Sequence, residues 1–134
     1  NKVGAGGNIG ADAVAKARDD HTIGLMINGN MTIAKLINPA VPYDPLKDFA
    51  PLTLIGTSPL VLTAPVSQPG VAATASTREF LATARSAGDQ WSYGTPGVGT
   101  VGHIGTELLK SRSGINPVHV PYAGYPQGLF VKVG

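Results

Sequence analysis

The chain has 134 residues, of which 43% are hydrophobic and 13% are charged, and it contains no cysteine. This length suits one ordinary domain or pieces of two small ones, and the composition excludes a disordered or coiled-coil protein. The formal net charge is only +2 and the basic residues form no stripe, so nothing supports nucleic-acid binding. The missing cysteines exclude disulfides, thiolate metal sites and a cysteine nucleophile, and no apolar run is long enough to span a membrane.

A glycine-rich turn occupies residues 4–10 near the start of the chain. The alanine-rich residues 11–17 behind it favour a helix, with Asn8 as the predicted N-cap. Residues 22–27 are typical of a buried strand, which the Asn-Gly-Asn run at 28–30 ends. We expect these turns to direct main-chain and Asn groups toward a cleft. The ligand contacts predicted in this part are Gly6, Gly7, Asn8 and Asn28.

A proline-rich loop follows a short predicted helix at residues 31–37. Prolines at three positions between residues 37 and 49 exclude a continuous helix there. We expect Tyr43 and Phe49 to pack together while the charged residues of this loop stay in water.

Two runs rich in β-forming residues come next, at 52–56 and 60–64, and each predicts a strand. Pro59 lies between them, and proline interrupts a strand because it cannot donate a ladder hydrogen bond. This break is the candidate crossover between two lobes, which we place at residues 1–59 and 60–134.

The last third of the chain predicts a regular β-α-β unit. A capping box at Ser76 and Glu79 opens a helix that Gly88 ends. The unit then consists of a strand at 90–93, a helix at about 100–113 and a strand at 118–120. Parallel strands joined by a right-handed crossover are the default arrangement for such a unit. The sequence therefore predicts an α/β fold with mainly parallel strands and glycine-rich strand-to-helix turns.

The strongest candidate site is the second glycine-rich turn, at residues 94–102. It stands at a helix N-terminus, where free N–H groups and the helix dipole attract anions, and its glycines let a ligand approach the main chain. No lysine follows the last glycine, so a carboxylate fits better than a triphosphate. A tight turn without any ligand is the alternative interpretation. The residues predicted to contact a ligand are Gly94, Thr95, Pro96, Gly97, Gly99, Thr100, His103 and, further on, Tyr122.

Other chemical candidates are weaker. His103 and Glu107 lie four residues apart on one helix, but no third metal ligand can be identified, so we interpret them as a surface pair and predict no metal site and no cofactor. His119 is interpreted as a hydrogen-bonded structural residue. Ser92 has no assignable histidine and acid partners. The N–H groups of the second turn could also form an oxyanion site, so a small hydrolase remains the alternative to a binding module.

Four motifs in order and spacing resemble the Bug family, the periplasmic solute-binding proteins of tripartite tricarboxylate transporters. They are GAGGNIGA at 4–11, YDPLKDFAP at 43–51, YGTPGVGT at 93–100 with His103, and VHVPY at 118–122. The resemblance implies two α/β lobes of the periplasmic-binding-protein kind that close on a small carboxylate, often a dicarboxylate or an aromatic acid. It also implies a periplasmic location and membrane components of a transporter as partners.

The sequence departs from the family at both ends. Family members are about twice as long, with a signal peptide and a first strand before the first glycine-rich turn, and neither is present here. Val3 replaces a usual proline, and the tail after Gln127 does not resemble the family. We therefore expect two incomplete lobes in a truncated chain. Open strand edges and exposed apolar surface would then favour a homodimer or larger assembly.

Overall fold

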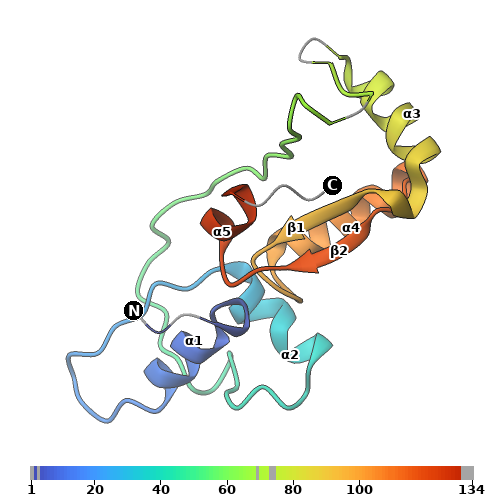
Figure 1. Ribbon diagram of the computed structural model, residues 1–134. Helices are drawn as coiled ribbons and strands as arrows, with labels where there is room; N and C mark the ends of the chain where they lie inside the picture. Colours follow the sequence, from blue (N-terminus) through green and yellow to red (C-terminus); the bar gives the residue numbers. More distant parts are fainter. Residues whose placement is uncertain (1, 3, 69, 73–74, 131–134) are drawn as a thin grey trace.

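The computed structural model describes residues 2, 4–68, 70–72 and 75–130. Figure 1 shows an N-terminal group of short helices, a C-terminal group built on two strands, and a long connection without helix or strand between them. The elements are η1 (Ala5–Gly7), α1 (Asn8–Ala15), η2 (Gly29–Ile33), α2 (Ala34–Ile37), α3 (Thr77–Ala87), η3 (Gly88–Gln90), β1 (Ser92–Thr95), α4 (Val101–Ser113), β2 (Val118–Pro121) and α5 (Tyr125–Phe130).

The N-terminal group has a small core of its own. Ala11 of α1 and Ala34 of α2 are buried together with Val41 and Tyr43 of the proline-rich loop. The Tyr43 ring meets the Phe49 ring edge-on, with 5.5 Å between their centroids, which confirms the predicted packing of this loop. Alanine on the two facing helices leaves room for the tyrosine, whose side chain is the largest one fully buried among the described residues.

The start of α1 corrects one prediction. Gly7, in the left-handed region at φ 92°, is the N-cap, and Asn8 is already the first helical residue. Asn8 is therefore not the cap, because its side-chain oxygen accepts hydrogen bonds from Tyr43 and Asn30 instead of a helix N–H group. The helix itself is present where it was expected.

The C-terminal group confirms the predicted β-α-β unit. β1 pairs with β2 in parallel, in a register that sets Ser92 opposite Val118. α4 connects them, begins at the N-cap Thr100 and ends at Gly114, which has φ 72°. Before them, α3 has the predicted capping box at Ser76. No helix in the part of the chain that the structure describes is long and apolar enough to cross a membrane.

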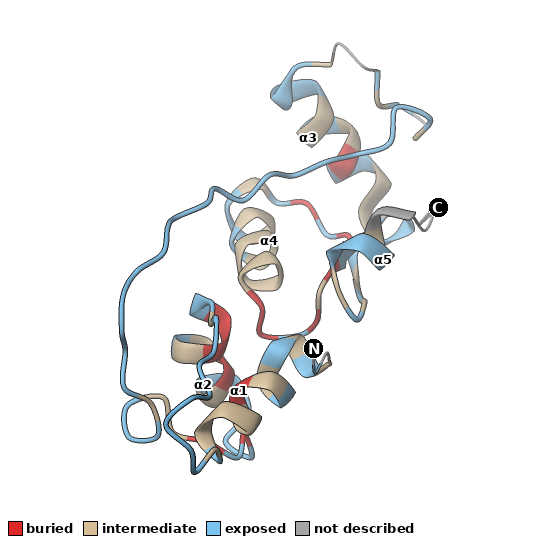
Figure 2. Ribbon diagram, turned by 90° about the vertical axis from the view of Figure 1, so that its left-hand side faces the viewer, coloured by how far each residue is buried: buried red, intermediate tan, exposed pale blue. Residues whose placement is uncertain are grey.

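Three of the predicted strands do not form. Residues 22–27, 52–56 and 60–64 are extended but unpaired, and the sheet within the described residues has only two strands. Figure 2 shows the connection from about residue 50 to residue 67 running exposed along the outside of the molecule. Leu52, for example, keeps 80% of its surface exposed. These runs have strand-like composition, but a strand needs a neighbour to take up its main-chain hydrogen bonds.

Candidate functional site

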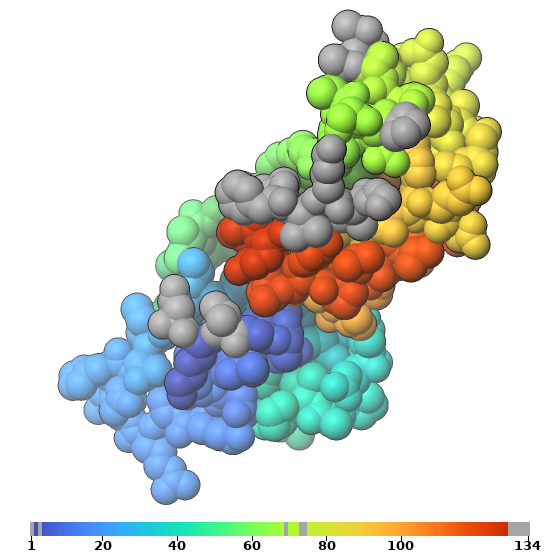
Figure 3. Space-filling view, viewed as in Figure 1, coloured from blue at the N-terminus to red at the C-terminus, as the bar shows by residue number. Residues whose placement is uncertain are grey.

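The two glycine-rich turns lie against each other. A Cβ atom added to Gly97 would stand 3.5 Å from the Gly6 nitrogen, and one added to Gly6 would stand 3.0 Å from the Thr100 methyl group. Gly29 approaches the same turn, because its Cβ would lie 3.2 Å from the Gly99 carbonyl oxygen. Figure 3 shows the blue and cyan N-terminal residues directly against orange and red residues of the C-terminal half. At Gly29 a side chain would press against the other backbone, and Gly6 and Gly97 have positive φ angles of 63° and 132°, which favour glycine.

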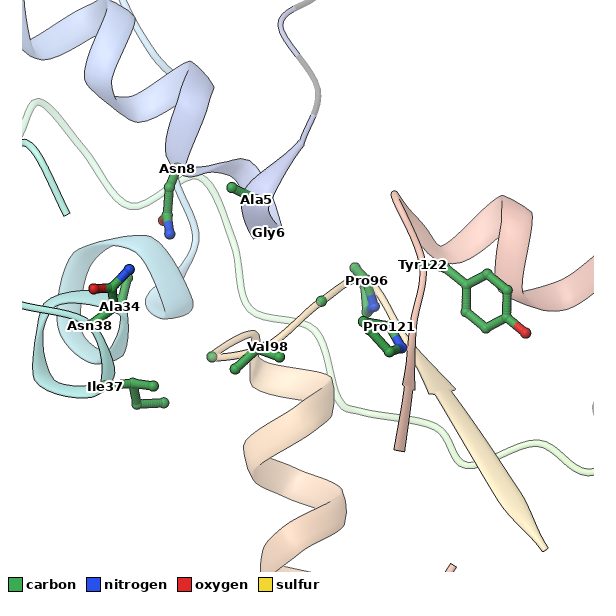
Figure 4. Close-up of a pocket in the computed structure, with 12 residues that line it drawn as sticks. Ala5, Gly6, Asn8, Ala34, Ile37, Asn38, Pro96, Val98, Pro121 and Tyr122 are labelled. Atoms are coloured by element: carbon green, nitrogen blue, oxygen red, sulfur yellow. The ribbon is translucent and has the colours of Figure 1, made fainter. Parts of the chain in front are cut away.

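A pocket of about 360 Å³ opens where the turns meet (Figure 4). It receives main-chain and side-chain groups from η1, α1, α2, the second turn and the end of β2. Its lining residues are Ala5, Gly6, Asn8, Ala34, Ile37, Asn38, Pro96, Gly97, Val98, Gly99, Pro121 and Tyr122. The structure thus brings together six of the predicted ligand contacts, namely Gly6, Asn8, Pro96, Gly97, Gly99 and Tyr122. The other six do not line it, namely Gly7, Asn28, Gly94, Thr95, Thr100 and His103.

The two threonines of the second turn have a structural role. Both are buried, with 3% of their surface exposed. The Thr100 hydroxyl donates to the Gly97 carbonyl oxygen at 2.7 Å and accepts from the His103 N–H at 3.4 Å. The Thr95 hydroxyl oxygen accepts from the Gly97 N–H at 3.2 Å and is bonded to His119 Nε2 at 2.6 Å. Thr95 and Thr100, which were predicted to contact a ligand, thus have their hydroxyls bonded within the protein and do not line the pocket.

The pocket nevertheless has the electrostatics of an anion site. No charged side chain lines it, and the second turn leads directly into the 13-residue helix α4. Among the described residues, no acceptor is bonded to the N–H of Val98, which is one of the lining residues. Helix α1 also begins at the pocket, with Asn8. The N-terminus of α1 and a free main-chain donor together favour a negatively charged group.

A cluster of aromatic and charged side chains supports the second turn from behind. The Gly99 N–H donates to His103 Nδ1 at 3.2 Å, and the His103 ring stacks on His119 at 4.3 Å between centroids. His119 in turn stacks on Tyr93, whose hydroxyl donates to Glu107. His119 is hydrogen-bonded as predicted. The interpretation of His103 and Glu107 as a pair on the surface is wrong, since each is half-buried and bonds another partner.

The titration properties of this cluster follow from its packing. Burial, followed by the nearby charge of His103, lowers the pKa of His119. Hydrogen bonds from Tyr93 and then from Lys110 lower the pKa of Glu107, while burial raises the pKa of Tyr93. The described residues contain no group of three or more His, Cys, Asp or Glu side chains that could hold a metal ion.

The Ser92 side chain gives the hydrolase alternative no support. Ser92 is exposed at the start of β1, and among the described side-chain hydrogen bonds neither His103 nor His119 contacts it.

Asn30 is the important residue that the sequence did not single out. It is buried, with 5% of its surface exposed, and its Nδ2 donates to the Gly6 carbonyl oxygen at 2.9 Å and to Asn8 Oδ1 at 2.8 Å. Asn28, which was predicted to face a cleft, is exposed and away from the pocket. The Asn-Gly-Asn run marked the right place, but sequence alone does not say which of its two asparagines turns inward.

The sequence matches the family model described as "tripartite tricarboxylate transporter family receptor" over residues 1–133. It is 37% identical over 125 residues to a UPF0065 protein from the tcbD-tcbE intergenic region of Pseudomonas sp. strain P51, covering 92% of this chain and 36% of that protein. It is 32% identical over 126 residues to the protein BugT of Bordetella pertussis, covering 92% of this chain and 37% of BugT.

Two solved structures have the same fold. One is that of the R. palustris protein Rpa4515 with adipate, with a TM-score of 0.88 and 32% identity over 96% of this chain and 42% of that one. The other is that of a periplasmic transporter, with a TM-score of 0.80 and 30% identity over the same shares of the two chains. The described structure is therefore part of a periplasmic-binding-protein-like fold, as the sequence predicted. This chain spans less than half the length of each of these relatives.

Proposed function

Because the chain belongs to the family of tripartite tricarboxylate transporter receptors, we propose that it binds a small carboxylate in the pocket between its two glycine-rich turns. The observation that carries this proposal is the N-terminus of α1 and the free Val98 N–H at a pocket without charged side chains. The structural neighbour with adipate supports a dicarboxylate as the ligand class.

The pocket offers a distinct place for each part of such a ligand. Its volume of about 360 Å³ falls within the range of roughly 300–1,000 Å³ that is usual for small-ligand sites. The Val98 N–H and the Asn8 amide would hold a carboxylate. Ile37, Pro96 and Pro121 would contact the methylene chain, because they supply apolar surface around those polar groups.

The cellular role that we propose follows the family. The chain would act in the periplasm and deliver its carboxylate to the membrane components of a tripartite transporter. The ligand would lie between the two partial lobes at residues 1–59 and 60–134, since the lining residues come from both segments.

We also propose that the chain assembles as a homodimer or larger oligomer. Leu52, Leu54 and Ile23 each keep more than three quarters of their surface exposed, at 80%, 79% and 78%. Residues 51–64 make no main-chain to main-chain hydrogen bond within the described structure. A second copy presents the same unpaired segments, so pairing between copies would satisfy both. Light scattering at micromolar concentration tests this, and a stable monomer of 13.7 kDa would overturn it.

Calorimetric titration with adipate tests the binding site. Gly99 lines the pocket and has φ 79°, whereas Gly114 has nearly the same φ of 72° at the other end of α4. Alanine in the left-handed region costs about 1–2 kcal/mol, so Gly99→Ala and Gly114→Ala should lose similar stability. We expect Gly99→Ala to weaken adipate binding by about tenfold or more, which is ~1.4 kcal/mol, and Gly114→Ala to leave it unchanged.

Equal effects of the two variants would contradict the proposed site. A folded wild-type protein that gives no heat with millimolar adipate, succinate or an aromatic acid would contradict carboxylate binding by this chain altogether.

A further inference from the structure

The side-chain amide of Asn8 can in principle face the pocket with either its oxygen or its NH₂ group. The two ends of an asparagine amide have nearly the same shape, so the hydrogen-bond partners decide its orientation. In this structure, the partners form a chain that begins at a main-chain carbonyl group. Because a carbonyl oxygen can only accept, it fixes the first link without ambiguity.

That carbonyl group belongs to Gly6. Its oxygen lies 2.9 Å from Asn30 Nδ2, so the amide of Asn30 must direct its NH₂ group there. The second hydrogen of the same NH₂ group points to the side chain of Asn8, at 2.8 Å. Asn8 must therefore present its oxygen to Asn30, because two NH₂ groups cannot hydrogen-bond each other.

Tyr43 adds a second donor at the same place. Its hydroxyl oxygen lies 2.9 Å from Asn8 Oδ1 and 3.0 Å from the Asn30 carbonyl oxygen, and its single proton serves these two acceptors. The Tyr43 side chain is 2% exposed, and burial raises the pKa of its hydroxyl, which stays protonated and available as a donor at neutral pH.

The NH₂ group of Asn8 takes no part in these hydrogen bonds. No acceptor is bonded to it among the described residues, and Asn8 is one of the residues that line the pocket (Figure 4). A rotated Asn8 would turn its NH₂ group toward the NH₂ group of Asn30, and neither group can accept from the other. The Tyr43 hydroxyl would keep the Asn30 carbonyl oxygen as its acceptor, so Asn30 is the residue that excludes the rotated state.

We propose that Asn30 is a specificity-determining positioning residue that holds the Asn8 NH₂ group toward the pocket, so that the site selects a carboxylate over a primary amide. A carboxylate offers only acceptors to this donor, whereas a primary amide also brings an NH₂ group that finds no acceptor on Asn8. This inference rests on the proposed carboxylate site and adds the reason for its selectivity.

The test compares adipate with its neutral diamide, adipamide, by calorimetric titration of the whole chain. Asn8→Asp keeps an acceptor for Tyr43 and Asn30 but replaces the free NH₂ group by a carboxylate oxygen. It should also fold, since an acidic residue at the start of α1 suits the helix dipole. We expect adipate affinity to fall at least about tenfold and the adipate-to-adipamide preference to fall with it, because one charge-assisted hydrogen bond is lost.

Ala5→Asp is the matched control, because Ala5 also lines the pocket, is exposed and has no side-chain donor to lose. It adds the same charge without touching Asn8, Asn30 or Tyr43. An equal loss of preference in Ala5→Asp and Asn8→Asp would show that charge alone is responsible and would overturn the proposal.

Asn30→Asp tests the positioning role. Its carboxylate can only accept, so it would attract the NH₂ group of Asn8 away from the pocket, and the preference for adipate over adipamide should fall. A merely structural role would weaken both ligands equally and overturn the proposal. If Asn30→Asp does not fold, Asn8→Asp still decides. Wild-type binding of adipate with unchanged preference in the variants defeats only this inference, while wild-type binding of neither ligand defeats the proposed function as well.

Discussion

The two glycine-rich turns that form the pocket are stabilised in different ways. In the second turn, the bonds of Thr95 to Gly97, of Thr100 to Gly97 and of Gly99 to His103 join residues only two to four positions apart. In the first turn, Asn30 reaches Gly6 across 24 positions and Tyr43 reaches Asn8 across 35. The second turn is thus largely a product of its own sequence, and the first depends on the packing of the N-terminal group.

The largest loss of stability is expected from a substitution where the N-terminal group contacts the second turn. An alanine methyl group at Gly29 would stand 3.2 Å from the Gly99 carbonyl oxygen and 3.3 Å from Thr100 Cα, and a backbone cannot move aside as a side chain can. We expect Gly29→Ala to lower the free energy of unfolding by about 1–3 kcal/mol, the usual range for overpacking. Urea denaturation measures it.

Gly56→Ala is the control, because nothing lies within 4 Å of a Cβ atom at that position. It should change stability by no more than about 0.5 kcal/mol. If Gly29→Ala were equally harmless, the close contact between the first and second turns would be disproved.

A smaller loss of stability is expected from removing the N-cap of α4, at the end of the second turn. Thr100→Ala removes the N-cap of α4 and the bond to the Gly97 carbonyl oxygen, which should cost about 1 kcal/mol and weaken adipate binding. Ser76→Ala removes the comparable cap of α3, away from the pocket, and should cost similar stability without any change in affinity. Unchanged adipate affinity in Thr100→Ala would contradict the idea that this turn is built locally.

The smallest expected effect is a change of stability with pH, and it arises from His119 in the side-chain cluster that supports the second turn. The pKa of His119 is lowered from its ordinary value of 6.5 by burial and then by His103, so the unfolded chain takes up this proton more readily than the folded one. The contribution of His119 to the stability of the fold is therefore fully present above pH 6.5 and declines as the pH falls below that value. Thermal melting between pH 8 and pH 5 should show the decline, less steeply in His119→Gln.

The exposed His21 supplies the control for this series. His21→Gln should lose as much stability as the wild type does when the pH falls from 8 to 5. A decline of the same size in His119→Gln would assign the pH dependence to groups other than His119.

The difference between the turns also explains what the sequence could predict. The capping box at Ser76, the helix that begins near residue 100 and the parallel β-α-β unit follow from local rules and were predicted, the second turn among them. The inward choice of Asn30 over Asn28 depends on Gly6 and Asn8, which come 24 and 22 positions earlier and meet the Asn30 side chain only in the folded chain. No local pattern carries that information.

The missing strands teach the same lesson at a larger scale. Residues 52–56 and 60–64 have the composition of strands, and so do Ser92–Thr95 and Val118–Pro121. Only the second set has a neighbour within the described chain, because α4 returns β2 to lie beside β1. A strand forms only where its residues also find a neighbouring strand and a covered face, so composition alone predicted strands that the described chain does not form.

The central claim is that a small carboxylate binds where the two turns meet, and a titration of backbone amide resonances with adipate tests it most directly. We predict saturable shifts of the amides of Gly6, Asn8, Val98 and Gly99, with little change in the amides of the exposed connection at residues 52–62. Shifts confined to other surfaces, or no saturable shift at millimolar adipate in a folded sample, would contradict the account.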